Sequence, residues 1–172
     1  MDALPYPDYD EYFEQLCSTS YQDALRPNLL LETARGCWWG AKHHCTFCGL
    51  NGQTMAFRSK SADRALDEFV QVTAKYPGYP IYVVDNILNL GYFKDLLPEL
   101  AKRNLGLDLF FEVKANLKKE HLHQLRAAGA SIIQPGIESL SDEVLHIMRK
   151  GVKALQNIQL LKWCKEIGLS PE

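Results

Sequence analysis

Short apolar runs alternate with helix-like segments along most of the chain, and this order limits the folds open to it. Four runs predict strands: residues 29–32, 81–84, 107–113 and 131–137. Five segments with helical spacing or capping residues predict helices: residues 61–75, 92–103, 118–128, 141–149 and 153–167. Strands that alternate with helices build a parallel sheet through right-handed crossovers, so the sequence predicts an α/β fold.

The length of the chain bounds how much of a barrel it can form. A closed eight-stranded β/α barrel takes about 250 residues, whereas this chain has 172. We therefore expect a partial (β/α)6 barrel, TIM-barrel-like, represented by its first four βα units and truncated before the fifth strand. Residues 1–27 contain three prolines and a short helix candidate near residues 12–17, which predicts a linker or leading segment before a core of residues 28–172.

Composition and charge exclude several classes of function. With 47% hydrophobic and 23% charged residues the chain can bury a core, and its net charge of -2 comes without long blocks of like charge. Nothing therefore marks a surface for nucleic acid or lipid. The apolar runs are far shorter than the roughly 20 residues that cross a bilayer, and no signal peptide is recognisable. We expect a cytoplasmic protein with no membrane partner and no nucleic-acid partner.

Three of the five cysteines are crowded into one Cx7CxxC pattern, formed by Cys37, Cys45 and Cys48. They follow the first predicted strand, where barrel enzymes place active-site loops, and an odd total argues for a metal site in a reducing compartment. A zinc site would need a fourth ligand, such as His43 or His44, and a dithiol redox pair would not explain Cys37. Three thiolates on a four-iron cluster leave one iron open for substrate chemistry, which favours the cluster.

Polar side chains also gather where the last two predicted strands end. At the end of one strand they are Glu112, Lys114 and Asn116, and at the end of the next they are Gln134, Gly136 and Glu138. Residues spaced two apart in a strand point to the same face, so each set of three shares a face. Burying such groups unpaired inside an apolar barrel is costly, so the spacing favours a ligand pocket, with a Glu112–Lys114 pair inside the barrel as the structural alternative.

Several stretches together carry a resemblance to a known family. They are the cysteine loop with its double Trp and double His up to Asn51 and Gly52, and residues 32–40, 57–61, 84–88, 112–117 and 134–141. With them the chain resembles the radical SAM superfamily, and within it the RiPP maturation radical SAM protein 1 family, over about residues 5–171. Members of that family modify ribosomally synthesised peptides.

The resemblance implies a cofactor set and a role for each matching residue. Cys37, Cys45 and Cys48 would hold a [4Fe-4S] cluster whose fourth iron is chelated by the amine and carboxylate of S-adenosylmethionine. Phe47 would lie near the adenine. Asp85 and Asn86 would bind the methionyl amino group, and Glu138 would contact the ribose or the methionyl end.

The same resemblance implies an activity and its partners. The cluster would cleave S-adenosylmethionine to a 5′-deoxyadenosyl radical or support methyl transfer, with a ribosomal precursor peptide as substrate and peptide C-methylation as one outcome. The electron donor would be a flavodoxin or ferredoxin. Family members often carry a cobalamin-binding domain before the barrel, although this chain does not itself imply cobalamin. The alternatives are a zinc-stabilised peptide-binding module without catalysis, and a radical SAM enzyme that acts on RNA or a small metabolite.

Overall fold

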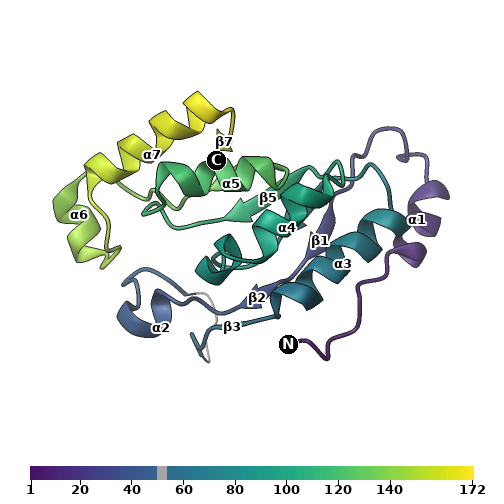
Figure 1. Ribbon diagram of the computed structural model, residues 1–172, viewed down its shortest axis with the longest axis horizontal. Coiled ribbons are helices and arrows are strands. Elements are labelled where there is room, and N and C mark those ends of the chain that lie inside the picture. The colour runs from purple at the N-terminus through teal and green to yellow at the C-terminus, as the bar shows by residue number, and fades with distance from the viewer. Residues whose placement is uncertain (50–53) are drawn as a thin grey trace.

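The predicted strands form one parallel sheet in the computed structural model, which describes residues 1–49 and 54–172 (Figure 1). Asn51 and Gly52 of the cysteine-loop motif lie outside the described residues. In spatial order the strands are β1 (Leu29–Leu31), β4 (Ile81–Val83), β5 (Leu109–Glu112), β6 (Ala130–Gln134) and β7 (Ser170–Pro171). The sheet and its crossover helices confirm the predicted α/β class.

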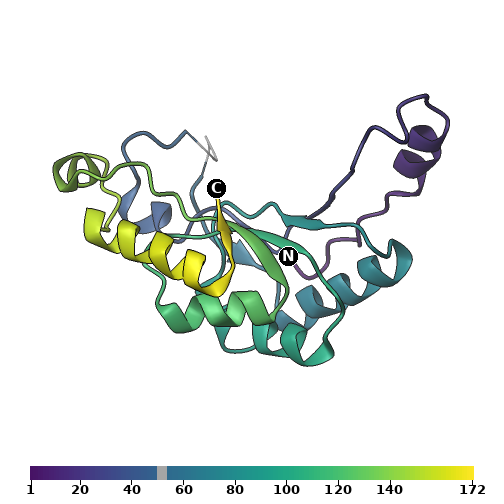
Figure 2. The ribbon, with the colours of Figure 1, turned by 90° about the horizontal axis from the view of Figure 1, so that it is seen from above.

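Four helices cover one side of this sheet. They are α3 (Ala62–Lys75), α4 (Leu96–Arg103), α5 (Lys119–Ala127) and α7 (Ala154–Ile167). Each packs beside the next, and Figure 2 shows them together on the same side. This one-sided cover is what right-handed crossovers produce in part of a β/α barrel.

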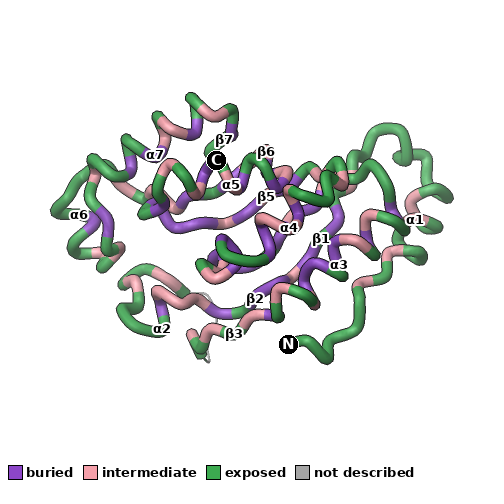
Figure 3. Tube along the Cα trace, viewed as in Figure 1, coloured by how far each residue is buried: buried purple, intermediate pink, exposed green. Residues whose placement is uncertain are grey.

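Alternate strand residues explain where the core lies. One row across the sheet is fully buried and joins the helix side chains in a single apolar cluster. Figure 3 shows buried stretches along the central strands. That row consists of Leu31, Val83, Phe111 and Ile133. The alternate row is less buried and lies on the other face of the sheet. It consists of Leu30, Tyr82, Phe110 and Ile132. The period of two therefore separates a helix-covered face from the inner face of the partial barrel.

The fifth strand begins earlier than expected. Ser170 and Pro171 already pair in parallel with Ile132 and Ile133 of β6, so the prediction that the chain is truncated before this strand was wrong. The sequence signal was weak because only two residues pair and one is a proline. Proline lacks the amide hydrogen that a strand donates and is therefore a poor indicator of a strand.

The helix predicted for residues 92–103 is two elements. A 3₁₀ turn, η1 (Leu90–Phe93), precedes α4, and the Asp95 carboxylate accepts a hydrogen bond from the Leu96 amide at 2.7 Å. An aspartate that caps a helix in this way starts a new helix instead of continuing the old one. The last predicted helix before α7 is shorter than expected, α6 (Asp142–Ile147), and its Ser141 cap is confirmed.

Small elements that the sequence did not indicate frame the cysteine loop. Strands β2 (Ala34–Arg35) and β3 (Arg58–Ser59) form a separate antiparallel pair, and α2 (Gly40–His43) is a single turn between the cysteines. Elements of two to four residues are too short to produce a recognisable period. Their pairing nevertheless fixes both ends of the segment that carries Cys37, Cys45 and Cys48.

The leading segment is tied to the core at a few points. Its helix, α1 (Asp10–Cys17), buries no residue and stands apart from the other helices (Figure 2). Lys75 pairs with Asp8 at 2.9 Å, and the Tyr9 hydroxyl is hydrogen-bonded to both backbone groups of Leu30 at the edge of β1. Among the described residues, no helix is long and apolar enough to cross a membrane.

Candidate cofactor site

The three cysteines of the Cx7CxxC loop line one cavity. It has a volume of about 170 Å³ and lies at the carboxyl ends of the central strands. The Gly40 amide donates to the Cys37 sulfur at 3.2 Å, and the Cys45 sulfur lies 4.0 Å from the Arg149 carbonyl oxygen. All three side chains are partly exposed, so each thiol is accessible from the cavity.

The other walls come from the ends of three neighbouring strands. Lining residues follow β4, β5 and β6, as the carboxyl ends of parallel strands meet at one edge. They include Asn86, Glu112, Lys114, Gln134, Gly136 and Glu138. The expectation that these alternating polar positions share a pocket is confirmed for five of the six residues named from the two strand ends; Asn116 is not among the lining residues.

Three of the four predicted cosubstrate residues lie at the cavity, and one does not. Phe47, Asn86 and Glu138 line it, with the Phe47 side chain half exposed. Asp85, by contrast, is 1% exposed and is absent from the lining. Asp85 therefore lies outside the lining of this cavity, whereas its neighbour Asn86 belongs to it.

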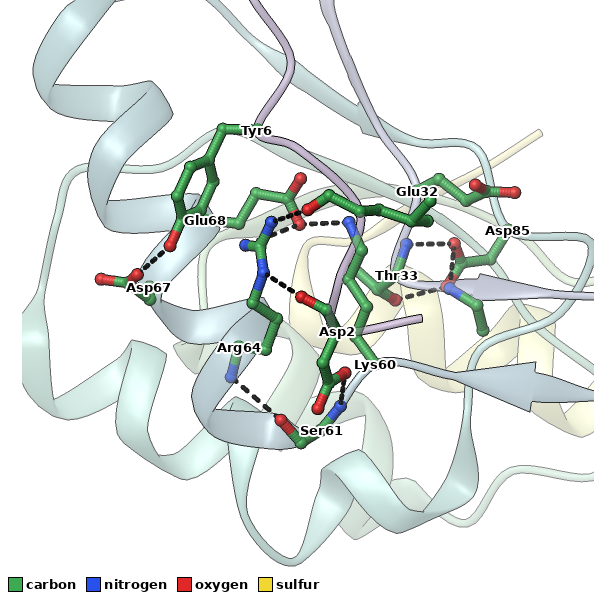
Figure 4. A network of polar contacts seen from close by, with 12 residues as sticks. Asp2, Tyr6, Glu32, Thr33, Lys60, Ser61, Arg64, Asp67, Glu68 and Asp85 are labelled. Carbon is green, nitrogen blue, oxygen red and sulfur yellow. Dashed lines mark hydrogen bonds and ion pairs between the residues drawn. The ribbon is translucent and has the colours of Figure 1, made fainter.

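Asp85 instead holds the chain just before the first cysteine. Its carboxylate accepts hydrogen bonds from the Thr33 amide at 2.7 Å, the Thr33 hydroxyl at 2.5 Å and the Ala34 amide at 2.8 Å (Figure 4). Burial raises the pKa of Asp85 to about 6, against the opposing effect of these hydrogen bonds. This carboxylate positions the entry into the cysteine loop.

A buried ion pair lies in the same region below the loop. Lys60 and Glu68 are paired with side chains only 3% exposed, and Arg64 lies 3.6 Å from the same carboxylate (Figure 4). The Tyr92 hydroxyl donates towards the carbonyl oxygens of Thr33 and Lys60. These contacts connect α3 and η1 to the two short strands that bracket the cysteine loop.

Two lysines bring positive charge to the cavity. Lys150 pairs with Glu138 at 2.9 Å, and its ammonium occupies the space where a side chain on Gly136 would lie. Burial, followed by the nearby Lys150 charge, lowers the pKa of Lys114 to about 8. Burial raises the pKa of the Cys45 thiol, and the charge of Lys150 opposes that shift. Cationic neighbours of this kind favour thiolates, the form that binds iron.

Lys114 does not form the ion pair with Glu112 that was considered from the sequence. Its ammonium donates to the carbonyl oxygens of Lys150 and Gly151 at 2.7 and 3.3 Å. Burial alone raises the pKa of Glu112, which lines the cavity beside it. The structural alternative for these two residues is thus wrong, and both belong to the cavity wall.

Both tryptophans of the loop anchor it by their indole N–H groups. Trp38 donates to the Leu88 carbonyl oxygen at 3.0 Å and Trp39 to that of Arg149 at 3.1 Å. His43 stacks on Trp39 with ring centroids 4.1 Å apart. Sequence reasoning missed Arg149 and Lys150, because no local pattern shows that a turn about a hundred residues away packs against the cysteines.

The donor set fits an iron–sulfur cluster with one open position. Three thiols face one cavity, and the other lining groups are carboxylate, amide and ammonium groups suited to an amino-acid-like ligand. A zinc ion would need a fourth ligand besides the three cysteines, and neither His43 nor His44 is among the residues that line the cavity.

Comparison with known proteins identifies the family. The model of the radical SAM superfamily matches residues 31–171, and the chain belongs to that superfamily. Membership implies a [4Fe-4S] cluster and S-adenosylmethionine as cofactors, in agreement with the donor set.

Two curated relatives are larger than this chain. An uncharacterized methyltransferase of Pyrococcus horikoshii is 25% identical over 173 residues, which cover 98% of this chain and 36% of that protein. The hopanoid C-3 methylase of Methylococcus capsulatus is 22% identical over 152 residues, 85% of this chain and 28% of the methylase. The chain therefore spans about a third of the length of these curated relatives.

Solved structures show the same fold. The cobalamin-dependent S-adenosylmethionine radical enzyme OxsB, with aqua-cobalamin and S-adenosylmethionine bound, matches with a TM-score of 0.73 and 26% identity over 98% of this chain and 25% of OxsB. Methylornithine synthase matches with a TM-score of 0.60 and 16% identity over 96% of this chain and 51% of the synthase. The second likeness concerns the fold alone.

Proposed function

We propose that this chain binds a [4Fe-4S] cluster and S-adenosylmethionine as the core of a radical SAM enzyme that methylates a ribosomally synthesised peptide. The observation that carries the proposal is the common cavity of Cys37, Cys45 and Cys48 at the carboxyl ends of the strands. Three thiolates leave one iron of a four-iron cluster without a protein ligand.

The residues around the cavity have distinct roles in this proposal. The cysteines hold the cluster, Asn86 and Glu138 bind the methionyl and ribose groups, and Phe47 packs near the adenine. When bound, the cluster and S-adenosylmethionine supply the radical or methyl chemistry. The cavity walls position the cosubstrate. The reducing cytoplasm would keep the thiols available to bind iron, and a flavodoxin or ferredoxin would supply the electron that reduces the cluster.

Methyl transfer is favoured by the named relatives. One curated relative is described as a methyltransferase and another as a methylase, and OxsB is cobalamin-dependent. We therefore include cobalamin among the cofactors of the whole protein. None of the cavity residues discussed above is assigned to cobalamin in this proposal.

A peptide substrate is favoured by the family resemblance and by a second hollow beside the cavity. This hollow, of about 740 Å³, is lined by α2, α6 and the start of α7, and it shares Trp39 with the cofactor cavity. Because Trp39 lines both hollows, a peptide seated in the second one would lie beside the cofactor cavity.

The first experiment is anaerobic reconstitution of the chain with iron and sulfide. Electron paramagnetic resonance of the dithionite-reduced protein is recorded with and without S-adenosylmethionine, for the wild type, Cys45→Ala and the matched control Cys17→Ala. Cys17 is exposed and lies on α1, away from the cavity lining. We expect a four-iron signal that changes on addition of S-adenosylmethionine, is lost in Cys45→Ala and is retained in Cys17→Ala.

Other outcomes would replace the proposal. A folded chain that retains zinc and gives no cluster signal would point to the zinc-stabilised peptide-binding module. For the substrate, the full-length enzyme is incubated with a candidate precursor peptide and the product is analysed by mass spectrometry. A mass increase of one methyl group on the peptide supports peptide methylation. Modification of RNA or a small metabolite, with the peptide unchanged, would contradict the peptide part and leave the cofactor part intact.

A further inference from the structure

Lys114 is a buried lysine whose ammonium is bound by carbonyl oxygens. It lies two residues beyond the end of β5 and is 4% exposed. Its Nζ donates to Lys150 O at 2.7 Å and to Gly151 O at 3.3 Å, and it lies 4.2 Å from the centre of the Trp39 ring. A cation close to an indole ring is attracted by it, most strongly where water is excluded.

The carbonyl oxygens come from the turn of residues 147–151, which begins at the last residue of α6 and precedes α7. The cysteine loop packs against this turn. Thr46 donates to this turn twice, from its amide to Met148 O and from its hydroxyl to Ile147 O, both at 3.2 Å. The Trp39 indole donates to Arg149 O. Residues next to Cys37 and Cys45 are therefore held by successive carbonyl oxygens of a single turn.

The shape of this turn is unusual and needs support. Arg149 has a φ of 55°, a left-handed conformation that is strained for a residue with a side chain. Gly151 has a φ of 67°, and a β-carbon there would lie 2.1 Å from the Trp39 ring. A strained turn in close contact with an aromatic ring persists only when neighbouring groups fix it, and the ammonium of Lys114 bonds two of its carbonyl groups.

We propose that Lys114 is a positioning residue that fastens the 147–151 turn and Trp39 together, and so holds the cysteine loop at the cavity. It links three separate parts of the chain: the end of β5, the turn before α7 and the loop between Cys37 and Cys45. The consequence of this anchor for cluster binding rests on the proposed function. Its role in holding the cysteine loop in place does not.

The chemistry of the site explains why a lysine suits this place. A methionine would fill the same volume but would leave two partly buried carbonyl groups without this donor and would remove the attraction to Trp39. An arginine keeps the charge and donates to carbonyl groups through its planar guanidinium, so it should restore most of the contacts.

Hydrogen exchange of the full chain, without cluster, tests the proposal. Exchange is followed by mass spectrometry in Lys114→Met, Lys114→Arg and the wild type. Lys94→Met serves as the matched control, because Lys94 is exposed and its side chain has no ion pair among the described residues. We expect about tenfold faster exchange of residues 37–48 in Lys114→Met, with exchange in α3 unchanged. Lys114→Arg should stay within about twofold of the wild type.

If Lys114 only stabilised the fold as a whole, Lys114→Met would lower global stability and accelerate exchange throughout the chain. Exchange in residues 37–48 that equals the control Lys94→Met overturns the proposal, and so does a uniform increase. If Lys114→Met does not fold, Gly151→Ala is measured by the same criterion, since its methyl group would displace Trp39 from the turn. Unchanged exchange of residues 37–48 in that variant also overturns the proposal.

A second readout connects the anchor to the cofactor. The rate at which a chelator removes iron from the reconstituted chain should rise about threefold or more in Lys114→Met and stay unchanged in Lys94→Met. A wild type that assembles no cluster would refute the proposed function, whereas the exchange comparison on the cluster-free chain would still decide the role of Lys114.

Discussion

Replacement of Asp85 separates a residue that holds the cysteine loop from one that binds the cosubstrate. The carboxylate accepts three hydrogen bonds, from the amides of Thr33 and Ala34 and from the Thr33 hydroxyl, in a fully buried place. Asp85→Ala removes all three acceptors. Asp85→Asn keeps an oxygen that accepts from both amides, and its new NH₂ group can donate to the Thr33 hydroxyl oxygen once that hydroxyl rotates.

The magnitudes follow from this difference. A buried donor left without its acceptor costs about 1–3 kcal/mol, so two amides and a hydroxyl left unpaired should cost Asp85→Ala at least about 3 kcal/mol in total. Asp85→Asn should lose less, about 1 kcal/mol near pH 4, because both amides keep their acceptor and only the Thr33 hydroxyl hydrogen must find a new one. The measurement is urea unfolding of each variant, followed by circular dichroism.

The pH dependence gives a second magnitude. The folded pKa of Asp85 is about 6, raised by burial above the ordinary value of 3.8, so the folded chain binds more protons than the unfolded chain between these values. The contribution of Asp85 to stability therefore falls as pH rises from about 4 to 6, by about 3 kcal/mol. Asp85→Asn cannot ionise, so its stability relative to the wild type should rise over the same interval.

Affinity for S-adenosylmethionine completes the comparison, measured by calorimetry on the reconstituted chain. Because Asp85 is outside the cavity lining, Asp85→Asn should bind the cosubstrate within about threefold of the wild type. A loss of tenfold or more in Asp85→Asn, with unchanged unfolding, would refute the positioning role and restore the role implied by the family resemblance. Equal destabilisation by alanine and asparagine would refute the hydrogen-bond reasoning.

Three further changes test other parts of the structure. Glu68→Gln should lower the free energy of unfolding by about 3 kcal/mol, because it leaves Lys60 buried without its carboxylate. The double variant Lys60→Met/Glu68→Leu should lower it by less, because neither charge remains. Denaturant unfolding of the two variants measures the difference. Gly36→Ala should lower the free energy of unfolding by about 2 kcal/mol and reduce iron incorporation. The reason is that Gly36 has a φ of 83° and that a methyl group there would lie 2.2 Å from Ala56 O. A normal iron content in this variant would contradict the prediction. Tyr9→Phe should lower Tm by about 2–4 °C, because it removes the hydrogen bonds between the Tyr9 hydroxyl and the backbone of Leu30 in β1. An unchanged melting curve would show that water replaces these hydrogen bonds without loss of stability.

The sequence predicted the main sheet well because its signals are local. Apolar runs and helical spacing are properties of neighbouring residues, so β4, β5, β6 and the helices between them could be placed to within a few residues. What it missed depends on contacts between distant residues or on very short segments. The pairing of Ala34 and Arg35 with Arg58 and Ser59 is one example, and the two-residue β7 is another.

The residues of the candidate site also fall into those that local sequence patterns predicted and those that depend on long-range contacts. The Cx7CxxC spacing identified the thiols, and alternation at strand ends identified Glu112, Gln134 and Glu138 as cavity residues. Lys150 was not found, because its place depends on the turn before α7 folding back over the cysteine loop. No period or motif in a single sequence reports a contact of that range.

Asp85 and Lys114 show that a polar residue at the end of a strand can line the cavity, hold the surrounding chain in place, or do both. Both follow apolar strands, and both are buried, yet only Lys114 lines the cavity. Desolvation disfavours the charged form of each, and each is bonded by groups on or next to the cysteine loop. Holding a loop around a cofactor requires strong, directional bonds that water does not disrupt, and buried charged groups provide them at some cost in stability. A polar residue at the end of a barrel strand therefore indicates the neighbourhood of the site, whereas its hydrogen-bond partners show whether it also holds the chain around the ligand.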